Sequence, residues 1–383
     1  MDLRLTEDQL ALREEARAFA TALRPALEAD PQWRRQGMLS DGDSREVTRA
    51  LGDAGWIGMT WPVESGGRGL THVDAALVED VLGYHWLPLS LYLLSYKTIG
   101  CAIERHGSPE LKERLLGPIA RGELTFCQGF SEPGAGSDLA SLTTRAALRD
   151  DTFVVHGHKI WTSSAWLADW IYLAARTDPD ELRHRGISVL VTPLDTPGIE
   201  VRRFPALGGG YLCEVFVDGA EIPAANLVGE VDRGWDVLMH TLDFERITAE
   251  KLGGLAWVLD GLESRLAETD RLDSAAWHRV SLLRGELAAA RLLSLRAADL
   301  LDRREPASAA SAMAKLAGAR LAQRIARDGM ELLGLEGLTD GHPALPLMGR
   351  LGALYRASVG STISGGSAEI LQVVIARRGL GLR

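Results

Sequence analysis

The sequence predicts an α+β protein with three domains: helices first, then β-strands, then helices again. In the first and last zones apolar residues recur with a helical period of about 3.6, whereas the middle zone holds short β-branched or aromatic runs with a period near two. No helical pattern separates those runs, which favours an antiparallel barrel or sandwich over a doubly wound sheet. We therefore expect a helical domain at residues 1–118, a β-domain at 119–234 and a helical bundle at 235–383.

Capping residues mark helices in the first zone. Thr6 and Gln9 form a capping box before a run with helical spacing. Ser108 is placed to cap a helix that has Pro109 at its first position, where the missing N–H does no harm. Two further helices are expected at residues 44–54 and 74–83.

Short runs in the middle zone are predicted as strands, because Gly, Pro or Asp separate them. They lie at residues 125–130, 153–161, 170–176, 187–194 and 214–222. His156 and His158 stand two apart in one run and so point to one face, which makes metal binding geometrically possible. No third ligand lies near them in the sequence, so we expect a polar sheet surface and no metal site.

The last zone is expected to contain long helices. Residues 274–304 and 307–333 each form one helical run, split by Pro306, and such neighbours suggest a bundle. Residues 235–252 form another run, with an apolar face made of Trp235, Leu238, Leu242, Ala249 and Leu252. Glu245 occupies one more position on that face. A buried carboxylate without a partner is costly, so Glu245 is a candidate functional residue.

Composition narrows the class of protein. The 383 residues carry a formal net charge of −10, which argues against nucleic acid or an anionic membrane as the main partner. No run of 18 apolar residues is present, so no membrane span is expected. The first residues lack the apolar core of a signal peptide, and the three scattered cysteines suit a reducing compartment, so we expect a cytoplasmic protein.

The loop at residues 130–142, with Pro133, Gly134, Gly136 and Ser137, follows a predicted strand. Such a loop exposes several backbone N–H groups, which suits a planar, acceptor-rich or anionic ligand. Composition alone also allows a tight surface loop that closes the β-domain. The absence of a GxGxxG motif after a strand leaves a Rossmann nucleotide site without support.

Five segments resemble the acyl-CoA dehydrogenase family in the same order, and the resemblance extends over nearly the whole chain. They are GWIGMTWPVESGGRGL (55–70), SEPGAGSD (131–138), HGHKIWTSS (156–164), EVFVDGAEIPAANLVGEVDRGW (214–235) and GGSAEILQVVIAR (365–377). The resemblance implies an N-terminal helical domain, a middle antiparallel β-domain and a C-terminal four-helix bundle. It also implies FAD-dependent α,β-dehydrogenation of an acyl-CoA thioester, in which a carboxylate removes a proton from Cα and hydride passes from Cβ to flavin N5.

The same resemblance assigns cofactor contacts by position. Phe130 and Ser131 match contacts to the flavin ring, and Ser137 matches a contact at the pyrophosphate or the substrate entrance. The stretch packed against the isoalloxazine corresponds to Trp161, Thr162 and Ser163. The protein is expected to orient the flavin and keep the slot dry, while the flavin supplies the redox chemistry.

The position of the catalytic base departs from the commoner pattern. Many members of the family carry it just before a Gly-Thr or Gly-Ser pair, but Gly365 stands before that pair here. In members similar to isovaleryl-CoA and long-chain acyl-CoA dehydrogenases, the base lies in a Leu-Asp-X-Glu-Arg stretch, which residues 242–246 match. The resemblance therefore implies Glu245 as base, with Arg246 beside it as a substrate contact and Glu369 as the fallback carboxylate. The other interpretations are a core glutamate paired with an arginine, or a side chain turned to solvent.

A second departure concerns assembly. Homotetrameric members carry an Arg-x-x-Phe-Gly stretch that reaches the FAD of a neighbouring subunit, and residues 261–277 contain no such stretch. A Gln-x-x-Gly-Gly element has become Glu331 to Leu335, with an acid first and leucine last. We expect a tetramer, either an α2β2 pair with a second family member, as in some bacterial relatives that act on steroid side chains, or a homomer in which other residues fill this role.

Alternative functions remain within the same fold. The acyl or aminoacyl group could be attached to a carrier protein instead of CoA, or the chain could be a flavin monooxygenase or a non-catalytic partner subunit. The last two are expected to lack the base or the SEPGAGSD loop, and this chain has both. The apolar segment 85–100 predicts an apolar acyl tail, and the family implies an electron-transfer flavoprotein or a similar acceptor.

Overall fold

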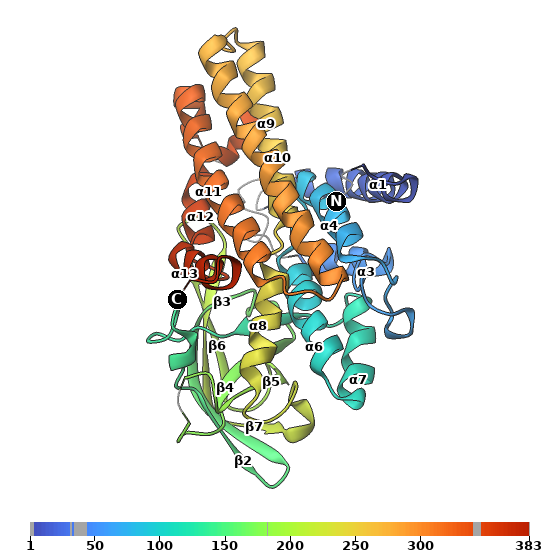
Figure 1. Ribbon diagram of the computed structural model, residues 1–383, viewed down its shortest axis with the longest axis vertical. Coiled ribbons are helices and arrows are strands. Elements are labelled where there is room, and N and C mark those ends of the chain that lie inside the picture. Colours follow the sequence, from blue (N-terminus) through green and yellow to red (C-terminus); the bar gives the residue numbers. More distant parts are fainter. Residues whose placement is uncertain (1–3, 31–32, 34–43, 182, 340–345, 383) are drawn as a thin grey trace.

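The computed structural model describes residues 4–30, 33, 44–181, 183–339 and 346–382. A long helical bundle occupies one end of the molecule and a twisted sheet the other, with the N-terminal helices packed along one side (Figure 1). Helix α8 lies beside the sheet and leads into the bundle. The predicted order of helices, strands and helices is confirmed.

The N-terminal helices begin where the capping residues predict. The Thr6 and Gln9 capping box is formed, and the Ser108 hydroxyl accepts from the Leu111 amide at the start of the helix that holds Pro109. An eight-residue π-helix, η3, spans Leu93–Gly100, and π-helical turns are often found at functional sites. The α-helices of this region are α1 (Glu7–Ala29), α3 (Arg45–Asp53), α4 (His72–Tyr84), α5 (Ser90–Tyr92), α6 (Cys101–His106) and α7 (Pro109–Ala120).

The sheet has seven strands in the order β1-β4-β2-β3-β7-β6, with β5 paired to β4. Most pairs are antiparallel, but β1 runs parallel to β4. The strands are β1 (Phe126–Gly129), β2 (Arg145–Arg149), β3 (Thr152–Ser163), β4 (Trp170–Arg176), β5 (Ile187–Pro193), β6 (Ile199–Pro205) and β7 (Tyr211–Pro223). Sequence reasoning missed β2 and β6, because both are largely exposed and arginine-rich, without a buried β-branched run.

The C-terminal region forms the predicted bundle of long helices. Its helices are α8 (Gly234–Glu245), α9 (Ala249–Glu268), α10 (Ser274–Asp302), α11 (Ser308–Leu333), α12 (Arg350–Ser361) and α13 (Ala368–Val374). One prediction is wrong: residues 235–252 are not a single helix. Helix α8 ends at Glu245, and α9 begins at Ala249 after a short non-helical link.

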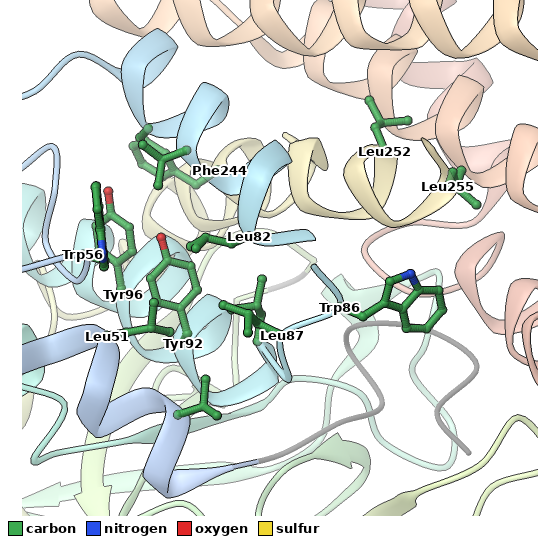
Figure 2. Packing of buried hydrophobic residues seen from close by; sticks show 14 of the residues in the cluster. Leu51, Trp56, Leu82, Trp86, Leu87, Tyr92, Tyr96, Phe244, Leu252 and Leu255 are labelled. Atoms are coloured by element: carbon green, nitrogen blue, oxygen red, sulfur yellow. The ribbon is translucent and has the colours of Figure 1, made fainter. Parts of the chain in front are cut away.

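Helices α4 and α9 touch backbone to backbone at two glycines. A Cβ added to Gly83 would lie 1.9 Å from the Glu250 carbonyl oxygen, and one added to Gly253 would lie 1.9 Å from the Asp80 carbonyl oxygen. Figure 2 shows the core beside this crossing, where Leu82 of α4, Tyr96 of η3 and Phe244 of α8 belong to one cluster. This packing fixes the start of α9 against the N-terminal helices.

None of the described helices combines the length and the apolar character needed to cross a membrane. Helix α9 spans 20 residues but carries charges along its length, including Lys251, Asp260 and Glu263. Helices α10 and α11 are longer and are likewise interrupted by charged residues.

Candidate active site

Glu245 is the last residue of α8 and is half-buried at the break before α9. Its Oε2 atom is buried and has no hydrogen-bond partner among the described residues. Buried polar atoms are normally paired, so an orphaned carboxylate oxygen marks a place where a ligand or a proton is expected. The alternative of a core glutamate paired with arginine does not match this geometry, because the neighbouring Arg246 directs its Nε to a backbone carbonyl.

The loop before α13 lies directly against this carboxylate. A Cβ added to Gly365 would lie 2.9 Å from Oε1 of Glu245, closer than real Cβ contacts allow. Gly365 also has a φ of +65°, in the left-handed region that favours glycine. The two positions at which the family is expected to carry its base therefore converge on one point, and a side chain at 365 would displace Glu245.

Arg246 ties this loop to α8. Its buried guanidinium donates from Nε to the Gly365 carbonyl at 3.1 Å, and its Nη1 lies 3.7 Å from Oδ1 of Asp243. Burial lowers the pKa of Arg246, and Asp243 and Glu245 oppose that effect. Asp243 in turn accepts from the Ser308 hydroxyl at 2.8 Å. These contacts hold α8, the loop that contains Gly365 and α11 together.

Lys315 of α11 is a site neighbour that sequence reasoning missed. The side chain is buried, donates to the Ser361 carbonyl and lies with its Cε 3.7 Å from the Cβ position of Gly365. Burial, with a contribution from Lys251, lowers the pKa of Lys315 to about 7, although Glu245 partly opposes the shift. In the sequence, Lys315 could have been found as the one lysine among the small apolar residues of α11.

We expect Lys315 to make stability depend on pH. Its folded-state pKa of about 7 lies below the ordinary 10.5, so between these values the unfolded chain binds more protons and stability rises with pH. Below pH 7 the folded protein carries the full free-energy cost of burying a charged Lys315. Lys315→Met should remove this slope, worth at most about 2–3 kcal/mol over two pH units.

Thermal midpoints of wild type and Lys315→Met, measured from pH 7 to 9, check this expectation. The control is Lys112→Met on α7, far along the chain from the loop that contains Gly365. Parallel pH curves for wild type and Lys315→Met would contradict it.

The loop at residues 130–142 is anchored by a buried ion pair. Lys159 of β3 is fully buried and donates to Oε1 of Glu132 at 2.8 Å and to the Phe130 carbonyl at 3.1 Å. Burial alone would raise the pKa of Glu132, but Lys159 and donors from Thr143 and Thr144 outweigh it and lower that pKa to about 2. Burial lowers the pKa of Lys159 to about 8, against the attraction of Glu132.

The two predicted flavin segments meet in the structure. The Ile160 amide donates to the Ser131 carbonyl at 2.9 Å, so the loop runs beside the end of β3. Phe130 is buried and Ser131 half-buried, whereas Ser137 is exposed at the outer part of the loop. The structure thus brings Phe130 and Ser131 close to the 161–163 stretch and places Ser137 further out.

The end of β3 offers an open, strained surface. Trp161 has a φ of +62°, and the residue is 58% exposed, which is unusual for one with so large a ring. Thr162 is buried, and its Oγ1 has no hydrogen-bond partner among the described residues, while Ser163 is half-buried. Nothing lies within 4 Å of a Cβ added at Gly134 or Gly136. The exposed ring of Trp161, the unpaired Thr162 hydroxyl and the open loop at residues 130–142 fit a planar, acceptor-rich group that carries phosphates. FAD is such a group.

The arginines near the missing Arg-x-x-Phe-Gly stretch are engaged within the chain. Arg265 and Arg271 both donate to the Glu336 carboxylate, at 3.0 and 3.1 Å. Arg279 lies 2.6 Å from Glu331 and 3.3 Å from Asp328. These guanidinium groups are therefore neutralised by neighbouring acids.

His156 and His158 face acids on β7. Nδ1 of His156 lies 3.1 Å from Asp218, and Nε2 of His158 lies 3.1 Å from Glu214. The described part of the chain contains no group of three His, Cys, Asp or Glu side chains arranged to hold a metal ion.

Comparison with known proteins follows the same three-part division. The acyl-CoA dehydrogenase N-terminal, middle and C-terminal domain models match residues 6–123, 127–219 and 232–380. The chain is 32% identical to the acyl-CoA dehydrogenase FadE26 of Mycobacterium tuberculosis, over 100% of this chain and 99% of that protein. Two solved structures are similar over 100% of this chain and 100% of theirs. They are the Tcur3481-Tcur3483 steroid ACAD (31% identity, TM-score 0.92) and the ChsE4-ChsE5 complex from Mycobacterium tuberculosis (30% identity, TM-score 0.88).

The chain belongs to the acyl-CoA dehydrogenase family. It is an oxidoreductase whose cofactor is FAD and whose reaction is the dehydrogenation of an acyl-CoA. The fold class, the cofactor and the reaction predicted from the sequence are thereby confirmed.

Proposed function

We propose that Glu245 is the base that removes the α-proton of the acyl-CoA. The observation that carries this proposal is that the Glu245 carboxylate lies 2.9 Å from where a Cβ at position 365 would be, so both positions at which the family carries its base lead to the same point. The orphaned Oε2 is free to accept a proton. When bound, FAD would supply the acceptor for the hydride that leaves Cβ. Phe130, Ser131 and the 161–163 stretch would hold the flavin ring, with Ser137 toward the phosphates or the substrate entrance.

Glu369 is a weaker candidate for the base. Its side chain is exposed in the first turn of α13, where water competes for every proton transfer. Glu245 instead ends a helix among buried neighbours, including Asp243, Phe244 and Arg246. Arg246 is proposed to act on the substrate side by holding the Gly365 loop against the carboxylate, since its Nε already binds that loop.

We further propose that the chain works as part of an α2β2 tetramer with a second family member. Its own arginines near residues 261–279 are paired to Glu331 and Glu336, so they do not offer a free cation to a neighbour's FAD pyrophosphate. Two similar structures carry names that join two proteins. Exposed apolar side chains of the C-terminal region are available for contacts between subunits: Tyr355, Val359, Ile363, Val373 and Leu380.

The acyl group is proposed to be bulky, such as a steroid side chain carried as a CoA thioester. One similar structure is named a steroid ACAD, at 31% identity over the whole chain. The predicted apolar wall at residues 85–100 contains buried Tyr92 and Tyr96, and its one charged residue, Lys97, is neutralised by Glu79 and Glu250. A cytoplasmic location, an electron-transfer flavoprotein as acceptor, and domain limits at 1–118, 119–234 and 235–383 complete the proposal.

Steady-state rates with three thioesters test this function. The enzyme, purified with any partner that co-purifies from its host, is given octanoyl-CoA, isovaleryl-CoA and a steroid-side-chain acyl-CoA with an artificial electron acceptor. We expect the highest kcat/KM with the steroid thioester, because uniform binding of a large apolar group increases kcat/KM. A preference for octanoyl-CoA would contradict the bulky substrate. Turnover of the same acyl group only when attached to a carrier protein would favour the carrier-protein alternative.

A further inference from the structure

We propose that Lys97 is a positioning residue for the reaction: it maintains the helix break that presents Glu245 to the substrate. This inference rests on the proposed role of Glu245 as base. Lys97 belongs to the N-terminal domain, on the π-helix η3, whereas the break lies 150 positions later at the entry to the bundle. The two are joined by one buried ammonium group.

Three oxygen atoms surround that ammonium. Lys97 Nζ lies 2.5 Å from Oε2 of Glu79 on α4 and 3.1 Å from Oε2 of Glu250 on α9, and it donates to the carbonyl of Ile247 in the break. The side chains of Lys97, Glu79 and Glu250 are only 9%, 3% and 3% exposed. A lysine ammonium has three protons, so this set satisfies it completely.

The Ile247 carbonyl explains why the break depends on Lys97. Residues 246–248 leave the helix, so the carbonyl of the buried Ile247 needs a donor from elsewhere. A buried carbonyl without a donor costs about 1–3 kcal/mol. Without Lys97, the Ile247 carbonyl would lose its donor, so the break would loosen and Glu245, two residues before Ile247, would lose its fixed place.

The surrounding packing makes the contact rigid. Glu250 lies in the first turn of α9, where a carboxylate is favoured by the helix dipole. The Gly83 and Gly253 backbone contacts hold that turn against α4, next to Glu79. Burial raises the pKa of Glu79 to about 7, so near neutral pH the cluster is close to charge balance around Lys97.

The competing interpretation is a buried ion cluster that stabilises packing and nothing else. It predicts lower thermal stability on removal and an unchanged chemical step. A matched comparison exists in the chain, because Asp80, the residue after Glu79 on α4, forms a bidentate ion pair with Arg291 of α10 at 2.8 and 2.9 Å. That pair also joins α4 to the bundle but does not touch the break.

The experiment compares, in the purified assembly with FAD, a variant that removes all three ionisable groups of the Lys97 cluster with a control that removes both charges of the Asp80–Arg291 pair. One is Lys97→Met/Glu79→Gln/Glu250→Gln, and the control is Asp80→Asn/Arg291→Met. The probe is whichever thioester of the three-member panel turns over fastest. Readouts are the single-turnover rate of flavin reduction, KM, flavin content and hydrogen exchange of the amides of residues 244–250.

We expect the triple variant to reduce flavin roughly 10- to 100-fold more slowly, the penalty of a misplaced catalytic group, with KM and flavin content unchanged. Its amides at 246–250 should exchange faster. The control should lose thermal stability but keep its rate and its exchange at 246–250. A triple variant that matches the control in rate and exchange would overturn the inference.

Two further variants keep the outcome interpretable. If the triple variant does not assemble, Lys97→Met/Glu79→Gln also removes the donor to Ile247 without changing the net charge, and the same slow rate is expected. Glu245→Gln is measured alongside. A near wild-type rate in Glu245→Gln would refute the base itself, whereas a slow Glu245→Gln beside a fast Lys97 variant would refute only the positioning role.

Discussion

Glu245→Gln is expected to keep the fold and the bound flavin but to lose the chemical step. Glutamine has nearly the same shape as glutamate, so the side chain keeps its place beside Gly365 while the proton acceptor is gone. Loss of a general base costs roughly 10²–10⁴-fold in rate. The measurement is single-turnover bleaching of the flavin absorbance after mixing with the steroid-side-chain acyl-CoA.

Glu369→Gln is the matched control, since Glu369 is exposed in the first turn of α13 near the same loop. It should bleach at close to the wild-type rate. Moving the carboxylate, with Gly365→Glu in a Glu245→Gly background, should recover part of the lost rate, because a Cβ at 365 reaches within 2.9 Å of the present carboxylate oxygen. Wild-type bleaching in Glu245→Gln would refute the assignment and direct attention to Glu369.

The chain expressed alone is expected to bind FAD poorly. The pyrophosphate of FAD needs a cationic partner, and in this fold the family draws that partner from a neighbouring chain. Arg265, Arg271 and Arg279 of this chain are already paired with Glu336 and Glu331. Loss of one charge-assisted contact costs about 1.5–3 kcal/mol, roughly ten- to a hundredfold in affinity.

Protein and flavin absorbance of the purified chain measure this directly. Co-expression with a family member that carries an intact Arg-x-x-Phe-Gly stretch should restore two flavins for each four chains, because only sites between unlike chains are complete. Replacing the carboxylate shared by Arg265 and Arg271, with Glu336→Gln, frees Arg271 and leaves Arg265 with Glu268 alone, and should raise FAD binding of the lone chain if Arg271 faces the site. A stable homotetramer with one FAD for each chain would refute the heteromeric assembly.

Local signals in the sequence predicted much of the fold. The capping box at Thr6 and the Ser108-Pro109 start each mark a helix end, because a cap uses residues within one turn of each other. The strand at 170–176 was predicted to the residue, since every position between its ends is buried and apolar. Family motifs then supplied the candidate flavin contacts and the base, which no local pattern contains.

Features that depend on distant contacts could not be predicted. The apolar stripe at 235–252 continues in phase across the break after Glu245, so periodicity alone indicated one helix. The break is stabilised by Lys97, and the approach of Gly365 to Glu245 joins residues 120 positions apart in the chain. The burial of Lys315 likewise depends on α12 and on the loop that contains Gly365, and both lie far from Lys315 in the sequence.

Exchange of the substrate's α-proton with solvent deuterium tests the role of Glu245 most directly, because it reports proton removal apart from hydride transfer. The assembly with FAD is incubated in D2O with the steroid-side-chain acyl-CoA, and deuterium at Cα is followed by mass spectrometry. We predict rapid incorporation with the wild type and with Glu369→Gln, and none above the uncatalysed background with Glu245→Gln. Incorporation at the wild-type rate in Glu245→Gln would contradict the account.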